Sequence, residues 1–429
     1  MQLNLKRPIR AIRHLADRYG HLNWALADQM IISGTNFVTG LLLARYLGVE
    51  KFGQFSLAWL AVIFIQSIQQ AAINDAMMSI GPKQSDDSRR AYFSIVFSHA
   101  FVFAIVSTAI VAIGILLTDQ IFGRPDIRAL LLPISAVVLV SQIQEFLRRY
   151  FYSVSRPHLS FLCDFVRYGV QITVLLWLFV RSETSIEGVF WVISAAAAAS
   201  AFLGFVNIER LKWPTNGWRK ISLRHWDFSK WLIGSTALSF VSGHIFEVIA
   251  AVMLGASAVG VLKAAQNIMG VTHVLYLSLL NFLPIRAALA YKEGGINQLR
   301  KFIRNAALLV TAVTAVFAFF VGLFPDQLMD LLYGSEFRSY GWVLLGYAVI
   351  YVLVGLASVI PYGLLTLEKT FPIILATGTA FVASVIIVYP LISLYGMGGV
   401  LIGLAVHQSI RVIIPYLAFQ RLAARVGAR

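Results

Sequence analysis

Five basic side chains lie within or beside long apolar stretches, and their chemistry suits the binding of an anionic group such as a phosphate. They are Arg148, Arg149, Arg167, Lys263 and Arg411. An arginine in hydrocarbon stays charged, so it needs a carboxylate, a carbonyl oxygen or an anionic ligand as its partner. Arg411 lies well inside its stretch, and three interpretations stay open for it: a binding site, a structural ion pair, or a side chain that extends to the membrane surface.

The other arginines have acidic residues close by in the sequence. Glu145 precedes Arg148 and Arg149 by about one helical turn, so either guanidinium could pair with it. Asp164 and Arg167 are three positions apart and could neutralise each other in the same way. Both groups are near the expected cytoplasmic ends of their stretches, where arginines also extend into the headgroup region.

Four amides and one carboxylate form a polar stripe along a single apolar stretch. These residues are Gln66, Gln69, Gln70, Asn74 and Asp75. Their spacing places most of them on one helical face, and amide groups are suited to hydrogen-bond the hydroxyl groups of a sugar. The stripe indicates either a polar cavity or a set of amides that bonds neighbouring helices together, and both interpretations stay open.

Four acidic residues in the predicted spans are candidates for binding a coupling ion such as a proton. They are Asp75, Glu145, Asp164 and Glu247. Glu247 shares a helical face with His244 and has no cation beside it in the sequence. It is therefore either protonated or paired across helices. The sequence does not choose among the four.

The sequence lacks the motifs of soluble enzymes. It has no P-loop, no dinucleotide-binding glycine fingerprint after a strand, and no H-E-x-x-H zinc motif. Cys163 is the single cysteine, which excludes an intrachain disulfide and a cysteine metal cluster. We therefore expect no metal ion, no cofactor and no ATP hydrolysis.

The elements that position these residues are membrane-spanning helices. The chain is 59% hydrophobic and 13% charged, with a mean hydropathy of +0.76, and apolar runs of roughly 20 residues, the length that crosses a bilayer, follow one another throughout. Because backbone polar groups must be paired in hydrocarbon, the predicted fold class is an all-α integral membrane protein. We predict about twelve spans, at 22–46, 52–78, 92–117, 129–152, 159–181, 187–209, 231–254, 261–285, 303–324, 341–367, 371–394 and 399–420.

Basic residues are distributed unevenly among the predicted loops. Most of the 35 lysines and arginines fall in the N-terminal tail, in alternate loops and in the C-terminal tail. This bias follows the positive-inside rule and places both termini in the cytoplasm. The formal net charge of +15 is therefore a sign of topology, and nucleic acid is not an expected partner. The first span is too long for the apolar core of a signal peptide, so we expect it to be retained.

One sequence pattern occurs twice, which indicates a duplicated architecture. Residues 47–58 read LGVEKFGQFSLA and residues 254–265 read LGASAVGVLKAA, with the shared frame L-G-x4-G-x4-A. In both copies the frame joins one apolar run to the next, where its glycines suit a tight turn. Two six-span lobes in parallel repeat are typical of a transporter with a site near the midplane. The predicted domains are a basic cytoplasmic tail at 1–21, an N-lobe of spans 1–6 at 22–209, a cytoplasmic linker at 210–230, and a C-lobe of spans 7–12 at 231–429.

The stretch Leu41–Ala58, with Asn36 before it and the second copy at 254–265, resembles the Wzx-type flippases of lipid-linked oligosaccharides. These form a family within the multidrug/oligosaccharidyl-lipid/polysaccharide (MOP) exporter superfamily. The resemblance covers essentially the whole chain. It implies a non-enzymatic protein of the bacterial inner (cytoplasmic) membrane that moves an undecaprenyl-diphosphate-linked oligosaccharide to the outer leaflet. Membrane lipid and proteins of polysaccharide polymerisation and assembly are the further partners that it implies.

The family has no catalytic motif to transfer, so the candidate site residues rest on charge and burial. In this interpretation the basic residues bind the diphosphate, the amides bind the sugar, and an acidic residue couples the movement to a proton gradient. Two other functions stay open. One is a cation-coupled drug antiporter of the same superfamily. The other is a membrane-embedded enzyme acting on lipid-linked sugars, although such enzymes usually carry a large extramembrane loop with catalytic acids.

Overall fold

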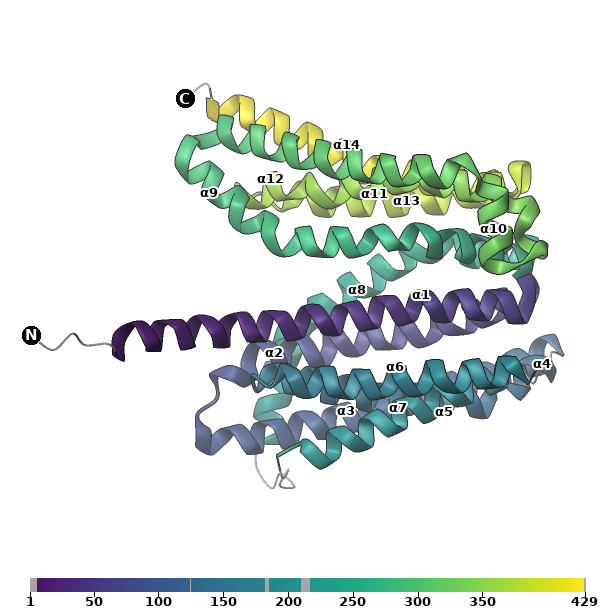
Figure 1. Cartoon of the computed structure of the whole chain (residues 1–429), viewed down its shortest axis with the longest axis horizontal. Helices are drawn as coiled ribbons and strands as arrows, with labels where there is room; N and C mark the ends of the chain where they lie inside the picture. Colours follow the sequence, from purple (N-terminus) through teal and green to yellow (C-terminus); the bar gives the residue numbers. More distant parts are fainter. Residues whose placement is uncertain (1–5, 124, 182–184, 210–216, 428–429) are drawn as a thin grey trace, which may run out of the picture. The chain divides into compact units, whose positions relative to one another are not determined.

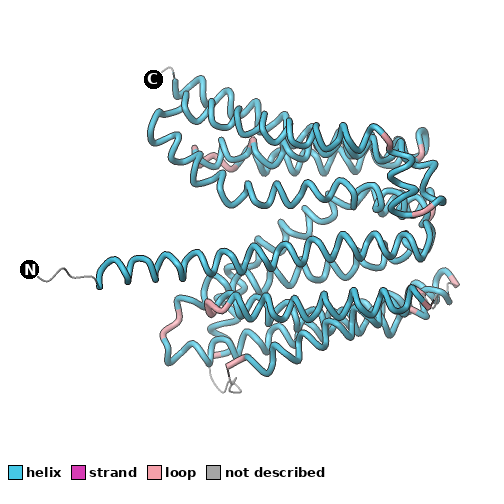
Figure 2. Tube along the Cα trace, in the orientation of Figure 1, coloured by secondary structure: helices cyan, strands magenta, loops and turns pink. Residues whose placement is uncertain are grey.

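The computed structural model describes residues 6–123, 125–181, 185–209 and 217–427. The described part is almost entirely helical and contains no strand (Figures 1 and 2). The elements are α1 (Lys6–Gln69), the π-helix η1 (Gln70–Asn74), α2 (Asp75–Ile80), the 3-10 helix η2 (Gly81–Lys83), α3 (Asp86–Phe122), α4 (Pro125–Ala129), α5 (Leu131–Ser153), α6 (Pro157–Val180), α7 (Ile186–Asn207), α8 (Trp218–Leu254), α9 (Ala256–Leu323), α10 (Pro325–Tyr333), the 3-10 helix η3 (Ser335–Tyr340), α11 (Gly341–Val359), α12 (Pro361–Thr366), α13 (Phe371–Tyr395) and α14 (Met397–Gly427).

Two of these helices are too long to cross a membrane once. α1 has 64 residues and α9 has 68, whereas about 20 residues span the hydrocarbon core. α1 bends at Gly48, and α9 bends at Gly294 and Gly295. Within the described residues, ten helices are long and apolar enough to span a membrane. Division of α1 and α9 at their bends raises the number of long helical segments to twelve.

Contacts divide the chain into two compact units. The first contains the residues up to Asn36 together with Ala58–Ala237, and the second contains Phe37–Leu57 together with Leu238–Arg429. In the described part, six long segments belong mainly to each unit: the two arms of α1, α3, α5, α6 and α7 in the first, and the end of α8, the two halves of α9, α11, α13 and α14 in the second. The predicted fold class, an all-α membrane protein with about twelve spans in two lobes, is confirmed. The exact domain boundaries stay a prediction.

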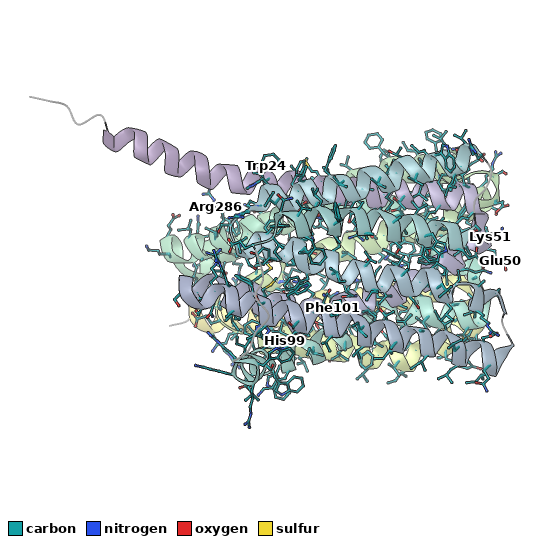
Figure 3. The ribbon with its side chains drawn as sticks, turned by 90° about the horizontal axis from the view of Figure 1, so that it is seen from below. Trp24, Glu50, Lys51, His99, Phe101 and Arg286 are labelled. Atoms are coloured by element: carbon teal, nitrogen blue, oxygen red, sulfur yellow. The ribbon has the colours of Figure 1, made fainter. Side chains whose placement is uncertain are left out.

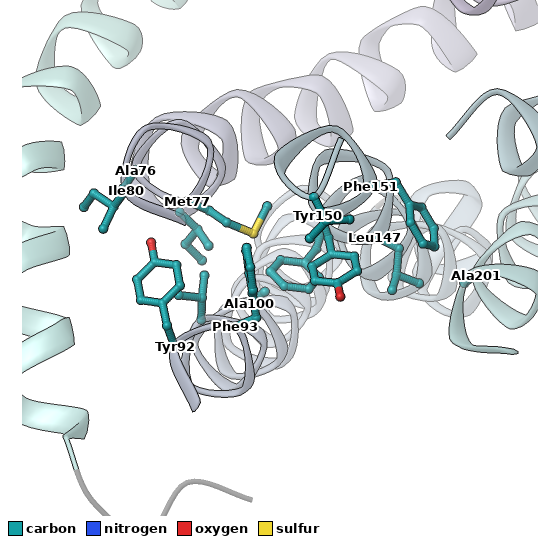
Figure 4. Packing of buried hydrophobic residues seen from close by; sticks show 14 of the residues in the cluster. Ala76, Met77, Ile80, Tyr92, Phe93, Ala100, Leu147, Tyr150, Phe151 and Ala201 are labelled. Atoms are coloured by element: carbon teal, nitrogen blue, oxygen red, sulfur yellow. The ribbon is translucent and has the colours of Figure 1, made fainter. Parts of the chain in front are cut away.

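An aromatic core holds α5 in the first unit. α5 packs against α2, α3 and α7, and Met77 of α2, Phe93 of α3 and Tyr150 of α5 are buried in the core between them (Figure 4). The rings of Phe93 and Tyr150 meet edge to face, with 5.0 Å between their centroids, the geometry that their quadrupoles favour. This apolar side of α5 fixes the orientation of its polar side, which carries the charged residues described below.

The predicted linker at 210–230 contains the beginning of α8. Residues 210–216 lie outside the described residues, but the chain is helical from Trp218 onward. His225 is buried, with its Nε2 2.9 Å from the hydroxyl of Tyr92. Ser229 donates a hydrogen bond to the carbonyl oxygen of Ala72, 3.0 Å away. The described part of the linker is therefore packed against the first unit.

The two copies of the repeated frame share one backbone conformation. Gly48 has φ 78° and ψ 173°, and Gly255 has φ 87° and ψ 175°. A positive φ of this kind favours glycine because a Cβ would be strained there. The predicted turn is therefore present in both copies, and each glycine ends one helix and begins the next.

The same two copies pack directly against each other in the second unit. A Cβ on Gly53 would lie 1.8 Å from the carbonyl oxygen of Ala256, and a Cβ on Gly260 would lie 2.2 Å from that of Val49. The contact is reciprocal, because Gly53 and Gly260 hold the same place in the frame, as do Val49 and Ala256. We call this pair of approaches the glycine contact. It explains why the turn of α1 belongs to the second unit.

Two side-chain hydrogen bonds also hold the turn of α1 in the second unit. The carboxylate of Glu336 accepts a hydrogen bond from the backbone N–H of Val49 at 3.0 Å, and Arg45 donates to the carbonyl oxygen of Leu331 at 2.8 Å. Lys51, just after the turn, lies at one end of the second unit, and Arg286 lies toward the opposite end (Figure 3).

Candidate functional site

Arg148 on α5 is the centre of a buried ionic network in the first unit. Its Nη2 lies 3.1 Å from Oδ2 of Asp28 on α1, and its Nη1 lies 3.3 Å from Oε1 of Glu145. Its Nε lies 2.7 Å from Oδ2 of Asp164 on α6, without the alignment of a hydrogen bond. The Arg148 side chain is 13% exposed. It therefore joins three helices through three carboxylates.

Asp164 and Arg167, which were predicted to neutralise each other, are not in direct contact as an ion pair: Asp164 pairs with Arg148, and Gln144 lies between Asp164 and Arg167. Nε2 of Gln144 donates to Oδ1 of Asp164 at 2.9 Å, and its Oε1 accepts a hydrogen bond from Nη1 of Arg167. All three side chains are buried. An amide can bridge an anion and a cation because it carries one donor end and one acceptor end.

Two further contacts complete this network. Arg149 donates from Nε to Oε1 of Glu145 at 2.7 Å, and the hydroxyl of Tyr152 donates to Oδ2 of Asp28 at 2.7 Å. Three guanidinium groups and three carboxylates thus lie together, so their formal charges cancel. Pairing lowers the cost of burying ions in a membrane, while the removal of one partner is expensive. Most of the ionic donors and acceptors here are already used by the protein.

Glu247 on α8 has its partner on α9. Its Oε2 lies 2.9 Å from Nζ of Lys263 and 3.0 Å from Nδ1 of His244. Lys263 also donates to Oε1 of Gln266 at 2.9 Å. Of the two states that the sequence left open for Glu247, the structure shows the pairing across helices.

We expect Lys263→Ala to lower the melting temperature of the purified protein, because it leaves the buried Glu247 without its cation. Loss of one partner of a buried pair costs about 3–5 kcal/mol, and His244 retains part of the stabilisation. The double variant Lys263→Ala/Glu247→Gln should melt above Lys263→Ala, since the unpaired charge is gone. Thermal melts in detergent measure both. A double variant that melts no higher than the single one contradicts the assignment of a structural ion pair.

Arg411 on α14 has a different environment. Its Nη1 is 3.5 Å from Oε1 of Gln408, and the side chain is half-buried. No carboxylate of a described residue lies within ion-pair distance of it. The neighbouring His407 is hydrogen-bonded instead to Ser384, 3.0 Å away. Arg411 is therefore a guanidinium inside a membrane span whose charge the described protein groups leave uncompensated.

The predicted amide stripe divides into a buried and an accessible part. Gln69 and Asn74 are fully buried, and Nε2 of Gln69 donates to the backbone carbonyl of Gln142 at 2.8 Å. Gln66 and Gln70 are only partly buried. The stripe passes through the π-helix η1, a distortion that is frequent at functional sites.

Asp75 differs from the other three acids that were predicted to bind a coupling ion. Glu145, Asp164 and Glu247 each lie in an ion pair. Asp75 accepts a hydrogen bond from Gln70, and no described basic side chain lies within ion-pair distance of it. The structure thus separates one unneutralised carboxylate from three neutralised ones.

The sequence predictions missed several members of these sites. Asp28, Gln144 and Tyr152 were not among the candidate residues, although each contacts a candidate. A signal existed for Asp28, which is the single acidic residue of the first predicted span. Gln144 offered no such signal, since a buried glutamine more often bonds a neighbouring helix.

A protein-family model fits the first part of the chain. The family is described as polysaccharide biosynthesis protein, and its model matches residues 23–288, more than half of the sequence. The chain belongs to this family. A comparison with curated proteins found no match.

Solved structures share its fold. An inward-facing multidrug resistance MATE family transporter of the MOP superfamily superimposes with a TM-score of 0.75 at 14% identity, over 93% of this chain and 96% of the transporter. The lipid II flippase MurJ, in an inward closed conformation, gives a TM-score of 0.67 at 12% identity, over 93% and 87% of the two chains. A MOP superfamily transporter from Pyrococcus furiosus gives 0.63 at 13% identity, over 94% and 96%.

At these identities the structural neighbours establish the fold. Together with the family match, they confirm the resemblance to the polysaccharide exporters of the MOP superfamily. The chain is thus a multi-pass membrane protein with the fold of that superfamily. The candidate site residues are not tested by these comparisons and stay predictions.

Proposed function

We propose that this protein is a flippase that moves an undecaprenyl-diphosphate-linked oligosaccharide across the bacterial inner membrane for surface polysaccharide assembly. Both termini face the cytoplasm in this proposal, and the two lobes expose a central site to each side in turn. Family membership and the MOP superfamily fold support this function. The single observation that carries it furthest is the uncompensated charge of Arg411.

An arginine cannot lose its proton in a membrane, so Arg411 requires an anionic partner that comes from outside the described protein groups. A diphosphate offers several charged oxygens to the planar guanidinium and could bind it through two parallel hydrogen bonds. The other predicted cations, Lys263, Arg148, Arg149 and Arg167, are already held by protein acceptors. We therefore assign the headgroup contact to Arg411 and a mainly structural role to the others.

The sugar part of the substrate requires hydrogen-bonding groups that it can reach. Gln66 and Gln70 keep partial exposure and are the better candidates, while Gln69 and Asn74 are buried inside the first unit. Polymerisation and assembly proteins would receive the glycan on the outer side.

A drug antiporter is less well supported by these charges. Transport of a cationic drug needs an accessible acidic residue. Asp28, Glu145, Asp164 and Glu247 are each neutralised by a basic side chain, so among these buried acids and Asp75 only Asp75 could serve. An uncompensated arginine would repel such a substrate.

Arg411→Ala should reduce surface polysaccharide about 10–100-fold, the expected effect of losing charge-assisted hydrogen bonds. Arg411→Lys should recover part of the export because it restores the charge without the planar donor pair. Arg421→Ala is the matched control, since Arg421 lies on the same helix and is exposed. Polysaccharide is quantified at equal protein level in the membrane. Normal export by Arg411→Ala removes Arg411 from the site.

A deletion strain tests the function itself. We expect the lipid-linked oligosaccharide to accumulate in the inner leaflet while its synthesis continues, and export to return with the wild-type gene. Failure to make the lipid-linked sugar assigns the protein to the membrane enzymes instead. Normal glycan together with sensitivity to cationic drugs assigns it to the antiporters.

A further inference from the structure

The polar stripe of the first unit presents oxygen atoms whose acceptor role is fixed by their neighbours. The carboxylate of Asp75 can only accept, so Gln70 turns its amide nitrogen toward Asp75. The amide oxygen of Gln70 then accepts a hydrogen bond from Nδ2 of Asn74 at 3.4 Å. This chain of hydrogen bonds sets the orientation of Asn74. Its Oδ1 is fully buried and receives no hydrogen bond from a described residue.

Gln69 is oriented in the same way. Its amide nitrogen donates to the backbone carbonyl of Gln142, so its Oε1 is also left as a buried acceptor without a described donor. The side chain of Gln142 is fully buried, and neither its oxygen nor its nitrogen has a partner among the described atoms. Buried polar groups without partners are rare and costly, so several in one place indicate an occupant.

The π-helix η1 places Gln69 and Asn74 on one side of the helix. Asp75 donates its backbone N–H to the carbonyl oxygen of Gln70, five residues earlier, so residues five apart follow one another along the same side of the helix. Gln69 and Asn74 have this separation, and both are buried. Asp75 and Gln70 are partly exposed, which gives a small ligand a way in.

The unpaired carboxylate at this place favours the binding of a proton or a cation. Asp75 lies within a membrane span and has no described ion-pair partner, and a bare carboxylate is costly at that depth. The neighbouring acceptors, Oε1 of Gln69 and Oδ1 of Asn74, add partial negative charge and cannot donate. These acceptor oxygens disfavour an anionic ligand and favour a donor or a cation.

We propose that Asp75, Asn74, Gln69 and Gln142 form a binding site for a small monovalent cation, for which Na⁺ serves as the probe. Carboxylate and amide oxygens are the ligands that hard cations prefer, and one carboxylate balances one positive charge. The described residues contain no group of three histidine, cysteine or carboxylate side chains of the kind that holds a metal ion. The binding itself does not depend on the substrate; only its role as the coupling ion rests on the proposed function.

The experiment measures binding of radioactive sodium to the purified full-length protein in detergent, with choline chloride as the background salt and no oligosaccharide present. We expect saturable binding that unlabelled sodium displaces and choline does not. Asp75→Asn should weaken it about 10–100-fold, the effect of losing a charged ligand. Asn74→Leu, similar in volume, should also weaken it, while Asp227→Asn should have no effect because Asp227 is exposed on α8.

A second measurement guards against misfolded variants. Sodium should raise the melting temperature of the wild type and of Asp227→Asn, because a ligand that binds the folded state stabilises it, and should not raise that of Asp75→Asn. Absence of saturable sodium binding overturns the proposal, as does equal binding by Asp75→Asn and the wild type. Because no oligosaccharide is used, failure here leaves the flippase function untouched, and failure of the flippase assay leaves the cation site untouched.

Discussion

Arg148→Ala is expected to destabilise the protein more than any other single substitution discussed above. It removes the cation that Asp28, Glu145 and Asp164 share. Glu145 keeps Arg149, but Asp28 and Asp164 lose the basic side chain that lies within ion-pair distance of them. Breaking one buried pair costs about 3–5 kcal/mol, a large part of the roughly 5–15 kcal/mol by which a protein is usually stable. We expect a strong loss of folded protein in size-exclusion profiles and a much lower melting temperature.

Arg149→Ala is the matched control for this prediction. Arg149 is the adjacent residue and is 28% exposed, and its partner Glu145 keeps Arg148. Its loss should cost about 1 kcal/mol or less, as partly exposed ion pairs usually do. The triple variant Arg148→Met/Asp28→Asn/Asp164→Asn should regain stability, because it removes the unpaired charges together with the cation. A wild-type melting curve for Arg148→Ala would show that the network is not structural.

The second large effect is expected at the glycine contact. Gly53→Ala places a methyl group against the carbonyl oxygen of Ala256, and a backbone atom cannot move aside as a flexible side chain can. The two helix starts must separate, which costs about 1–3 kcal/mol or more for overpacking. We expect lower thermal stability and reduced export for Gly53→Ala, and the same for Gly260→Ala.

Two features make this prediction specific. Gly53→Ala and Gly260→Ala disturb one contact, so the double variant should lose less than the sum of the single losses. Gly34→Ala and Gly270→Ala are controls on α1 and α9, because a Cβ at either position meets no atom within 4 Å. A helical Gly→Ala change of this kind is neutral or stabilising, by about 0.5–1 kcal/mol. Additive losses in the double variant would show that the glycines act separately.

The fold class could be predicted from the sequence because a bilayer restricts the choice so severely. Long apolar runs must be helices in a bilayer, and the number of runs of about 20 residues gives the number of spans. The repeated frame also predicted both turns. The frame could not predict that Gly53 packs against Ala256. The periodicity of a helix shows which of its faces is buried, but not which distant helix covers that face. The assignment of Phe37–Leu57 to the second unit follows from that contact.

The charged sites were predictable only in part, even where partners share a helix. The spacing of Glu145 and Arg149 indicated their pair. That of Asp164 and Arg167 did not, because Asp164 pairs with Arg148 and reaches Arg167 only through Gln144. Partners on other helices depend on packing and had no signature in the sequence. Lys263 was thus predicted to bind a ligand without its link to Glu247.

The glycine contact also has a consequence for how the protein is made. The turn at residues 47–53 leaves the ribosome before its partner at 254–260, separated by about half of the chain. At about 5–20 residues per second, translation of the intervening residues takes on the order of ten seconds or more. During that time the first turn resides in the membrane with its glycine face uncovered. The first six spans therefore cannot finish their assembly alone, and biogenesis of the two halves is coupled from the start.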